Sequence, residues 1–123
     1  MSFNLFVYGT LRAGGPADDI LTGCEQLGRA TVGGTLYDID GRFPALVLYG
    51  NAPVQGEIWR CPAELLARLD AYEDTGSGLF RRIATHVTFD GGTLPCWLYT
   101  AGPALSRLLT PERRMADGDW SAR

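Results

Sequence analysis

The chain contains no lysine and only one histidine, and both shortages exclude particular kinds of chemistry. All eleven of its basic side chains are arginines. Without lysine the chain can form neither a Schiff base with a carbonyl substrate nor a P-loop, because that motif needs its lysine on the phosphates. One histidine cannot supply a two-histidine metal site. We therefore expect a site that uses no metal and no cofactor.

Cysteine is also scarce, with three residues at positions 24, 61 and 96. Their number is odd, they lie far apart and no CxxC motif occurs, so the pattern favours neither a disulfide framework nor a zinc site. Long apolar segments are missing as well. The longest unbroken run, Ala45 to Tyr49, is too short to cross a bilayer, and Leu5 to Tyr8 is too short for a signal peptide. We expect a cytoplasmic protein with reduced thiols and no membrane partner.

The sequence has no excess of positive charge. Eleven basic side chains against fourteen acidic ones give a formal net charge of −3. This balance argues against a nucleic-acid partner, which usually selects a basic surface. The length of 123 residues, with 46% hydrophobic and 20% charged residues, is typical of one folded domain, which we expect over residues 1–123.

Short β-prone segments, separated by glycine and proline, make up most of the chain. We expect one clear helix from Pro62 to about Glu73, because proline suits the first helical position. This pattern predicts an α+β fold, in which a mixed or mostly antiparallel sheet curls toward a barrel. The expected strands cover residues 3–8, 26–39 (kinked at Gly33-Gly34), 45–48, 54–60, 80–89 and 93–100, with turns at Asp40-Gly41 and Asp90-Gly91-Gly92, a short helix at 18–21, and an irregular tail after Ala101 with a helical turn near 105–109 and Trp120 packed on the body.

The predicted helix carries an acid on its apolar stripe. At about 100° per residue, Leu65, Leu69, Leu66 and Tyr72 fall on one face of the helical wheel. Glu73 falls between Leu69 and Leu66 on the same wheel, at about 80°. A carboxylate that faces a core is costly to ionise unless it is paired, so its pKa rises. Such a group has the properties of a general acid or base near neutral pH.

A structural role for Glu73 is the alternative. The helix can end at Tyr72 and turn Glu73 out to solvent, or Arg81 or Arg82 can neutralise it, because structural ion pairs also perturb carboxylates. Asp70 and Asp74 fall further round the wheel and are expected to lean toward solvent.

A glycine-rich loop, Tyr8-Gly-Thr-Leu-Arg-Ala-Gly-Gly15, follows the first strand. Successive backbone N–H groups in such a loop can form an anion-binding nest. The loop lacks the GxGxxG dinucleotide pattern. Glycine at a strand end also marks an ordinary turn, so the loop by itself leaves both interpretations open.

Several motifs, in order along the chain, resemble those of the γ-glutamylcyclotransferase-like proteins, the family that includes the AIG2-like proteins and the γ-glutamylamine cyclotransferases. Leu5-Phe-Val-Tyr-Gly-Thr-Leu11 is similar to the family's opening Tyr-Gly-Ser/Thr-Leu signature. Further matches are Gly34-Thr-Leu-Tyr-Asp38, Phe43-Pro-Ala45, Val54-Gln-Gly-Glu-Ile-Trp59 and Leu69-Asp-Ala-Tyr-Glu73 followed by Phe80-Arg-Arg82.

The resemblance implies a small barrel of about six strands with flanking helices and a cavity at one end. It implies Glu73 as the catalytic acid and base. It also implies that the loop of Tyr8, Gly9, Thr10 and Leu11 binds the substrate, largely through backbone N–H groups. Expected cavity walls are Phe43, Phe80, Trp97, Tyr99 and the loop 74–79. Two departures are Asp74, where the family often has glycine, and Phe80, where it commonly has tyrosine.

The predicted function is cleavage of a γ-glutamyl amide, with release of 5-oxoproline and an amine or amino acid. The expected partner is therefore a small-molecule γ-glutamyl substrate. One alternative is a module that binds a small anionic metabolite in the same cavity without catalysis, and another is an oligomeric scaffold without an open cavity. The sequence leaves the leaving group and the oligomeric state open.

Overall fold

The computed structural model describes residues 1–120, and the last three residues of the expected domain 1–123 lie outside the described part. Its main elements are seven strands and one α-helix within those residues: β1 (Ser2–Val7), β2 (Glu25–Gly33), β3 (Thr35–Ile39), β4 (Phe43–Val47), β5 (Pro53–Pro62), α1 (Leu66–Tyr72), β6 (Phe80–Phe89) and β7 (Gly92–Ala101). The remaining helical segments are short 3₁₀ turns, including Asp18–Leu21 as expected.

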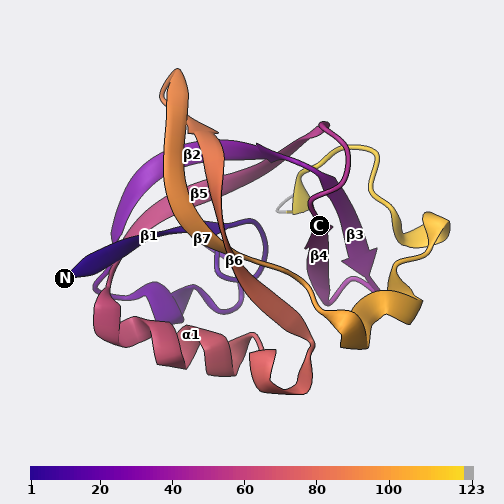
Figure 1. Cartoon of the computed structure of the whole chain (residues 1–123), viewed down its shortest axis with the longest axis horizontal. Helices are drawn as coiled ribbons and strands as arrows, with labels where there is room; N and C mark the ends of the chain where they lie inside the picture. The colour runs from indigo at the N-terminus through magenta and orange to yellow at the C-terminus, as the bar shows by residue number, and fades with distance from the viewer. Residues whose placement is uncertain (121–123) are drawn as a thin grey trace.

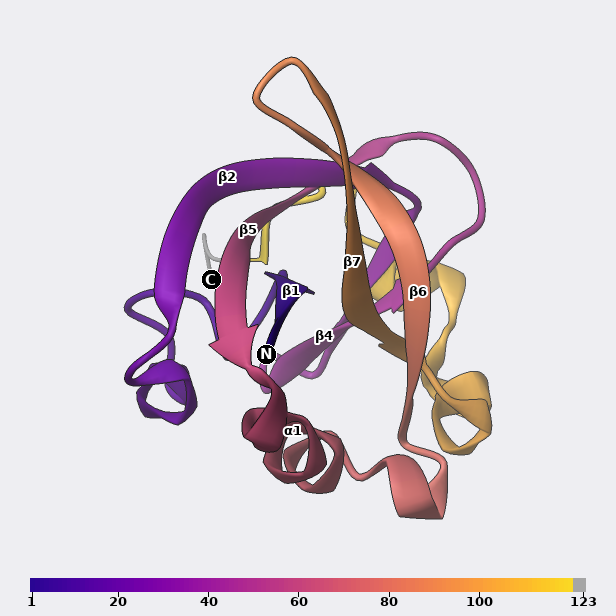
Figure 2. The ribbon, with the colours of Figure 1, turned by 60° about the vertical axis from the view of Figure 1, so that its left-hand side comes forward.

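Five of the strands close into a barrel in the order β1-β5-β2-β6-β7. All neighbours are antiparallel except β1 and β7, which run parallel and meet where Leu5 faces Trp97. Helix α1 lies against one side of the barrel, and the β6–β7 hairpin projects beyond the opposite side (Figures 1 and 2). The expected mixed, mostly antiparallel barrel is confirmed, with five strands rather than six.

The prediction of one kinked strand over residues 26–39 was wrong, because the chain leaves the barrel at Gly34. Strand β3 pairs with β4 in a separate two-stranded ribbon (Figure 1). A Cβ on Gly34 would lie 2.7 Å from the carbonyl oxygen of Val47, so only glycine allows this close approach. The bulge lies earlier, between Gln26 and Gly28, where Gly28 has a φ of 146°.

The helix is shorter than predicted. Pro62 still belongs to β5, where it pairs with Ser2, and a 3₁₀ turn at Ala63–Leu65 precedes α1. The cross-strand pairing of Pro62 therefore overrides its preference for the first helical position. At the other end α1 stops at Tyr72, and Glu73 is its capping residue.

The chain after Ala101 packs back onto the body. A 3₁₀ segment covers Pro103–Leu108, close to the helical turn expected at 105–109. Trp120 is buried, and its Nε1–H donates to Asp38 Oδ1 at 2.8 Å, which confirms the expected tail anchor.

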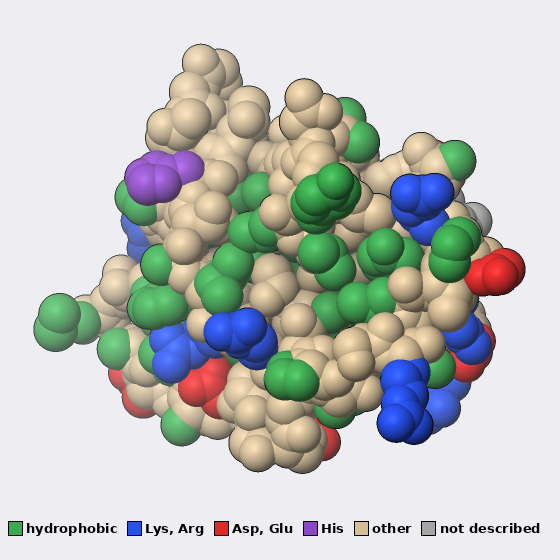
Figure 3. All heavy atoms as spheres, turned by 45° about the vertical axis from the view of Figure 1, so that its right-hand side comes forward, with side chains coloured by type: hydrophobic (Ala, Val, Ile, Leu, Met, Phe, Trp, Pro, Cys, Tyr) green, Lys and Arg blue, Asp and Glu red, His purple; other side chains and the backbone are tan. Residues whose placement is uncertain are grey.

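No helix in residues 1–120 is long and apolar enough to cross a membrane. On the face shown in Figure 3, arginine side chains lie toward the left and the right of the view, and hydrophobic side chains occupy much of the area between them.

Candidate active site

One cavity of about 270 Å³ lies between the loop after β1, the end of α1 and the start of β4. Its volume is close to the lower end of the range for small-molecule sites. It brings together the predicted acid Glu73, all four predicted loop residues and three predicted wall residues. The lining residues are Phe6, Val7, Tyr8, Gly9, Thr10, Leu11, Arg42, Phe43, Pro44, Tyr72, Glu73, Leu79, Phe80 and Tyr99.

Glu73 is half-buried and lines this cavity. Its backbone N–H donates to the carbonyl of Leu69 at 2.9 Å, which holds the residue at the end of α1 although the helix stops one residue earlier. Among the hydrogen bonds and ion pairs within residues 1–120, none involves its carboxylate. Helix α1 does end at Tyr72, but Glu73 faces the cavity and is not neutralised by Arg81 or Arg82.

Burial raises the pKa of Glu73 from its ordinary value of 4.5 to about 7. The pKa values of two tyrosines that line the same cavity are also raised, and the charge of Glu73 is one of the causes. Burial, with the negative charge of Glu73 as a second cause, raises the pKa of Tyr8 well above its usual range. Burial, the hydrogen bond to Asp70 and the nearby carboxylates also raise the pKa of Tyr99. Both phenols therefore stay neutral, and Glu73 is the group of this cavity that titrates near pH 7.

Asp70 does not lean toward solvent as the helical wheel suggested. Arg82 Nε donates to Asp70 Oδ1 at 2.9 Å, and the Tyr99 hydroxyl donates to the same oxygen at 2.7 Å. The Arg82 guanidinium also lies 4.4 Å from the ring centroid of Trp97. Arg82, which could have neutralised Glu73, is therefore paired with Asp70 instead. A wheel places only the residues of one helix, and strands β6 and β7 supply these partners.

The loop after β1 carries backbone donors without an acceptor at residues that line the cavity. Its own turn uses the N–H groups of later residues: Arg12 donates to Gly9, Gly15 to Arg12 and Ala17 to Thr10. Within the described residues, the N–H groups of Gly9, Thr10 and Leu11 have no acceptor. Three successive free donors beside a cavity are the arrangement that binds a carboxylate or an oxyanion.

Tyr8 contributes to the site through its backbone rather than its hydroxyl. The hydroxyl donates to the Tyr99 carbonyl at 2.5 Å and accepts from the Leu46 N–H at 3.3 Å. These two contacts join β1 to β7 and to the β3–β4 ribbon. A further hydrogen bond of 2.7 Å joins the hydroxyls of Thr10 and Tyr72, so the loop is also tied to α1.

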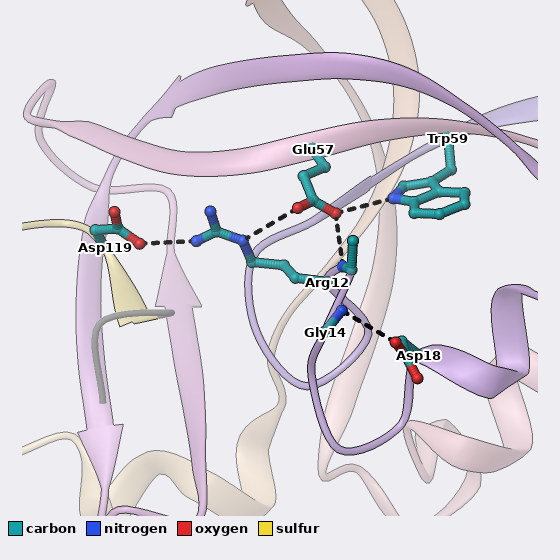
Figure 4. A network of polar contacts seen from close by, with 7 residues as sticks. Arg12, Gly14, Asp18, Glu57, Trp59 and Asp119 are labelled. Carbon is teal, nitrogen blue, oxygen red and sulfur yellow. Dashed lines mark hydrogen bonds and ion pairs between the residues drawn. The ribbon is translucent and has the colours of Figure 1, made fainter.

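Polar contacts with Glu57 of β5 and with Asp119 fix the position of the loop after β1 (Figure 4). Glu57 on β5 is 8% exposed, and its Oε1 accepts from the Ala13 N–H at 3.0 Å and from Trp59 Nε1 at 3.1 Å. Its Oε2 lies 3.8 Å from Nε of Arg12, whose Nη1 donates to Asp119 at 2.8 Å. A role for Glu57 was not predicted from the sequence, although an acid between Gly56 and Ile58 in an apolar strand is a signal for a buried, paired carboxylate.

The cavity wall differs from the expectation at Trp97 and over residues 74–78 of the loop 74–79. Phe43, Phe80 and Tyr99 line it, and the rings of Phe43 and Phe80 meet edge to face at 5.8 Å. Trp97 does not line it, because its ring lies under Arg82 instead. Of the loop 74–79, Leu79 reaches the cavity. Asp74 has a φ of 54°, the left-handed conformation that glycine adopts most easily after a helix.

Gly9 is packed against the β3–β4 ribbon. A Cβ at this position would lie 2.5 Å from Cγ of Pro44 and 2.7 Å from Cδ. We expect Gly9→Ala to displace the loop and raise KM or Kd about tenfold, with a loss of about 1–3 kcal/mol in unfolding free energy typical of overpacking. Steady-state kinetics and urea unfolding measure the two effects. Gly92→Ala, which adds the same methyl to open space, is the control and should change neither.

Comparisons with known proteins identify the family of the chain. A family model described as "Gamma-glutamyl cyclotransferase, AIG2-like" matches residues 5–122. A Gamma-L-glutamyl-butirosin B gamma-glutamyl cyclotransferase of Niallia circulans is 39% identical over 102 residues, which cover 78% of this chain and 65% of that protein. The chain thus spans slightly less than two thirds of the length of this relative.

Solved structures show the same fold. The crystal structure of a mouse AIG2-like protein has a TM-score of 0.73 and 25% identity, and the match covers 91% of this chain and 82% of that one. An uncharacterized Pyrococcus horikoshii protein, PH0828, has a TM-score of 0.73 and 26% identity over 98% of this chain and 91% of that one.

The fold and the site together describe a small β-barrel protein whose cavity contains an acid and has the size of a small metabolite. This chain belongs to the AIG2-like γ-glutamyl cyclotransferase family. No group of three or more histidine, cysteine or acidic side chains placed to hold a metal ion occurs in residues 1–120.

Proposed function

We propose that the protein cleaves a γ-glutamyl amide by internal cyclisation and releases 5-oxoproline together with an amine or amino acid. The observation that carries this proposal is an unpaired carboxylate, with a pKa of about 7, in the same cavity as three free N–H donors. Membership of the γ-glutamyl cyclotransferase family supports the reaction class. The 39% identical relative is named for its action on a γ-glutamyl compound, γ-L-glutamyl-butirosin B.

The first half of the mechanism assigns a base and an anion site. The α-carboxylate of the substrate binds two of the three free N–H groups of Gly9, Thr10 and Leu11, which leaves one for the γ-carbonyl oxygen. Glu73, as carboxylate, accepts a proton from the α-ammonium group and leaves a neutral amine. The amine nitrogen attacks the γ-carbonyl carbon, and the carbonyl π electrons move to oxygen. Holding the chain in this folded shape lowers the barrier, because the attack becomes a positioned intramolecular step.

The second half breaks the amide. The tetrahedral intermediate carries an oxyanion, which loop N–H donors stabilise. After the attack the ring nitrogen still carries two hydrogens and a positive charge. Glu73 returns its proton to the leaving nitrogen and, again a carboxylate, accepts the second proton of the ring nitrogen. The C–N bond breaks with its electrons on the leaving nitrogen, the carbonyl reforms in the five-membered ring, and the second proton passes to the released amine or to solvent. A group with a pKa near the working pH both accepts and donates protons efficiently. The neutral Tyr8 and Tyr99 keep the surroundings of Glu73 weakly polar.

A mass-spectrometric screen of γ-glutamyl amino acids, amines and isopeptides for 5-oxoproline release tests the proposal. We expect turnover of at least one class. Tight binding across the panel without any 5-oxoproline would instead favour the non-catalytic binding module.

The pH dependence of the reaction should follow Glu73. Because its carboxylate form is the base, we expect kcat/KM to rise about tenfold per pH unit below pH 7 and to level off above it. Initial rates between pH 5 and 9 in buffers of constant ionic strength measure this profile. A rate that is constant from pH 5 to 8 contradicts the assignment of Glu73 as the titrating base.

A further inference from the structure

A second charged side chain lines the cavity, and the proposed mechanism does not use it. Arg42 follows the Asp40-Gly41 turn between β3 and β4, and its backbone N–H donates to Ile39 at 3.0 Å. It precedes Phe43 and Pro44, which form the wall of the cavity that faces Gly9. Within the described part of the chain, Arg42 and Glu73 are the two lining residues with ionisable groups that carry charge near neutral pH.

The guanidinium of Arg42 is available to a ligand. Among residues 1–120, no acidic side chain pairs with it. The nearest acid in sequence, Asp40, accepts from Arg113 Nε at 3.2 Å and is therefore engaged elsewhere. Arg12 and Arg82, which also lie near the site, are held by Asp119 and Asp70. Arg42 is thus the basic side chain that the fold leaves free at this cavity.

The glutamyl end of the substrate does not need this charge. In the proposed mechanism the loop N–H groups bind its α-carboxylate and its γ-carbonyl oxygen, and Glu73 faces its α-amine. The side chain of Arg42 is exposed, and Arg42 lines the same cavity. Its unpaired guanidinium fits a second anionic group, because its planar donors match a carboxylate in two parallel hydrogen bonds. In a γ-glutamyl compound that second carboxylate can belong only to the leaving part.

We propose that Arg42 forms a carboxylate subsite for the leaving group, so that the protein prefers γ-glutamyl amino acids over γ-glutamyl amines without a carboxylate. This proposal rests on the proposed function and names the substrate class of the same site. The half-buried Phe43 and the exposed ring of Tyr72 line the same cavity and offer apolar surface for the leaving side chain. A cationic leaving group should be disfavoured at the same place by charge repulsion.

Two substrates that differ only in the carboxylate provide the test. γ-Glutamyl-alanine and γ-glutamyl-ethylamide share the glutamyl end and the two-carbon leaving chain. We expect the parent protein to have a kcat/KM about tenfold or more higher for the alanine compound, which is the order of magnitude of a charge-assisted contact between a guanidinium and a carboxylate. Arg42→Gln should reduce this ratio to about one.

Arg68→Gln is the matched control. Arg68 is an exposed arginine on α1 that does not line the cavity, and its replacement changes the net charge by the same amount. The control should keep the parent's ratio. Equal kcat/KM values for the two substrates in the parent overturn the proposal, and so does a preserved ratio in Arg42→Gln.

The failure of the proposed function is distinguishable from the failure of this inference. If the parent releases no 5-oxoproline from either compound, calorimetric titration of the two compounds still measures their relative affinity. A preference for the alanine compound that disappears in Arg42→Gln then supports the subsite in a binding protein. Equal affinities overturn it.

Discussion

Replacement of Glu73 by glutamine is expected to lower the rate of 5-oxoproline release by about 10²–10⁴-fold, the usual contribution of a general acid or base. Glutamine keeps the size of the side chain and removes the titrating proton. The fold should be retained, since no hydrogen bond or ion pair within residues 1–120 depends on this carboxylate. The rate is measured by mass spectrometry on any substrate that the screen identifies.

Thermal unfolding of the same variant gives a second readout. The fold raises the pKa of Glu73 from 4.5 to about 7, so the native state favours the protonated form. The parent therefore loses stability as the pH rises through this window, whereas the glutamine variant does not. We expect the Tm of Glu73→Gln minus that of the parent to increase from pH 4.5 to 7 and then to stay constant.

Glu64→Gln is the matched control for both measurements. Glu64 is exposed in the 3₁₀ turn before α1 and does not line the cavity. It should leave the rate and the pH dependence of Tm unchanged. Parent-like activity in Glu73→Gln removes the proposed mechanism.

Replacement of Glu57 by alanine is expected to cost about 3–5 kcal/mol of unfolding free energy, the usual penalty for breaking a buried ion pair. The change removes the acceptor of the Ala13 N–H and of Trp59 Nε1, and it leaves the buried Nε of Arg12 without its nearby carboxylate. Urea unfolding followed by Trp fluorescence measures the loss. The loop that carries the free N–H groups should also exchange its amide hydrogens faster.

Glu57→Gln separates the charge from the hydrogen bonds. Its amide oxygen can still accept from Ala13 and Trp59, so we expect a smaller loss of stability together with weaker substrate binding. Glu25→Ala is the control, because the pair of Glu25 with Arg60 is exposed and 3.5 Å long. Such a surface pair contributes less than about 1 kcal/mol. A Glu57→Ala variant as stable as Glu25→Ala shows that the network does not hold the loop.

Most strands and turns of the fold follow from local sequence. The β6–β7 hairpin is predicted by alternating residues around Asp90-Gly91, which adopt φ values of 52° and 77°. The run from 26 to 39 was predicted wrongly, because both halves have β-forming sequences and only their partners differ. Strand β2 pairs with β5, whereas β3 pairs with β4. Between β2 and β3, Gly34 approaches the carbonyl oxygen of Val47 too closely for any residue with a Cβ. Periodicity within one segment carries no information about such partners.

Some features of the candidate site also follow from local sequence, and others follow only from tertiary contacts. The sequence by itself determined that an acid lies on the apolar side of a helix and that a glycine-rich loop follows the first strand. Both features are local, since they depend on helical periodicity and on residue types in a short loop. The tertiary structure decided that the two meet in one cavity, that Asp70 rather than Glu73 receives Arg82, and that Arg42 is left unpaired there. Those outcomes depend on contacts between strands, helix and ribbon that are distant in the chain, because the competition among charged side chains for partners is resolved only when the barrel closes.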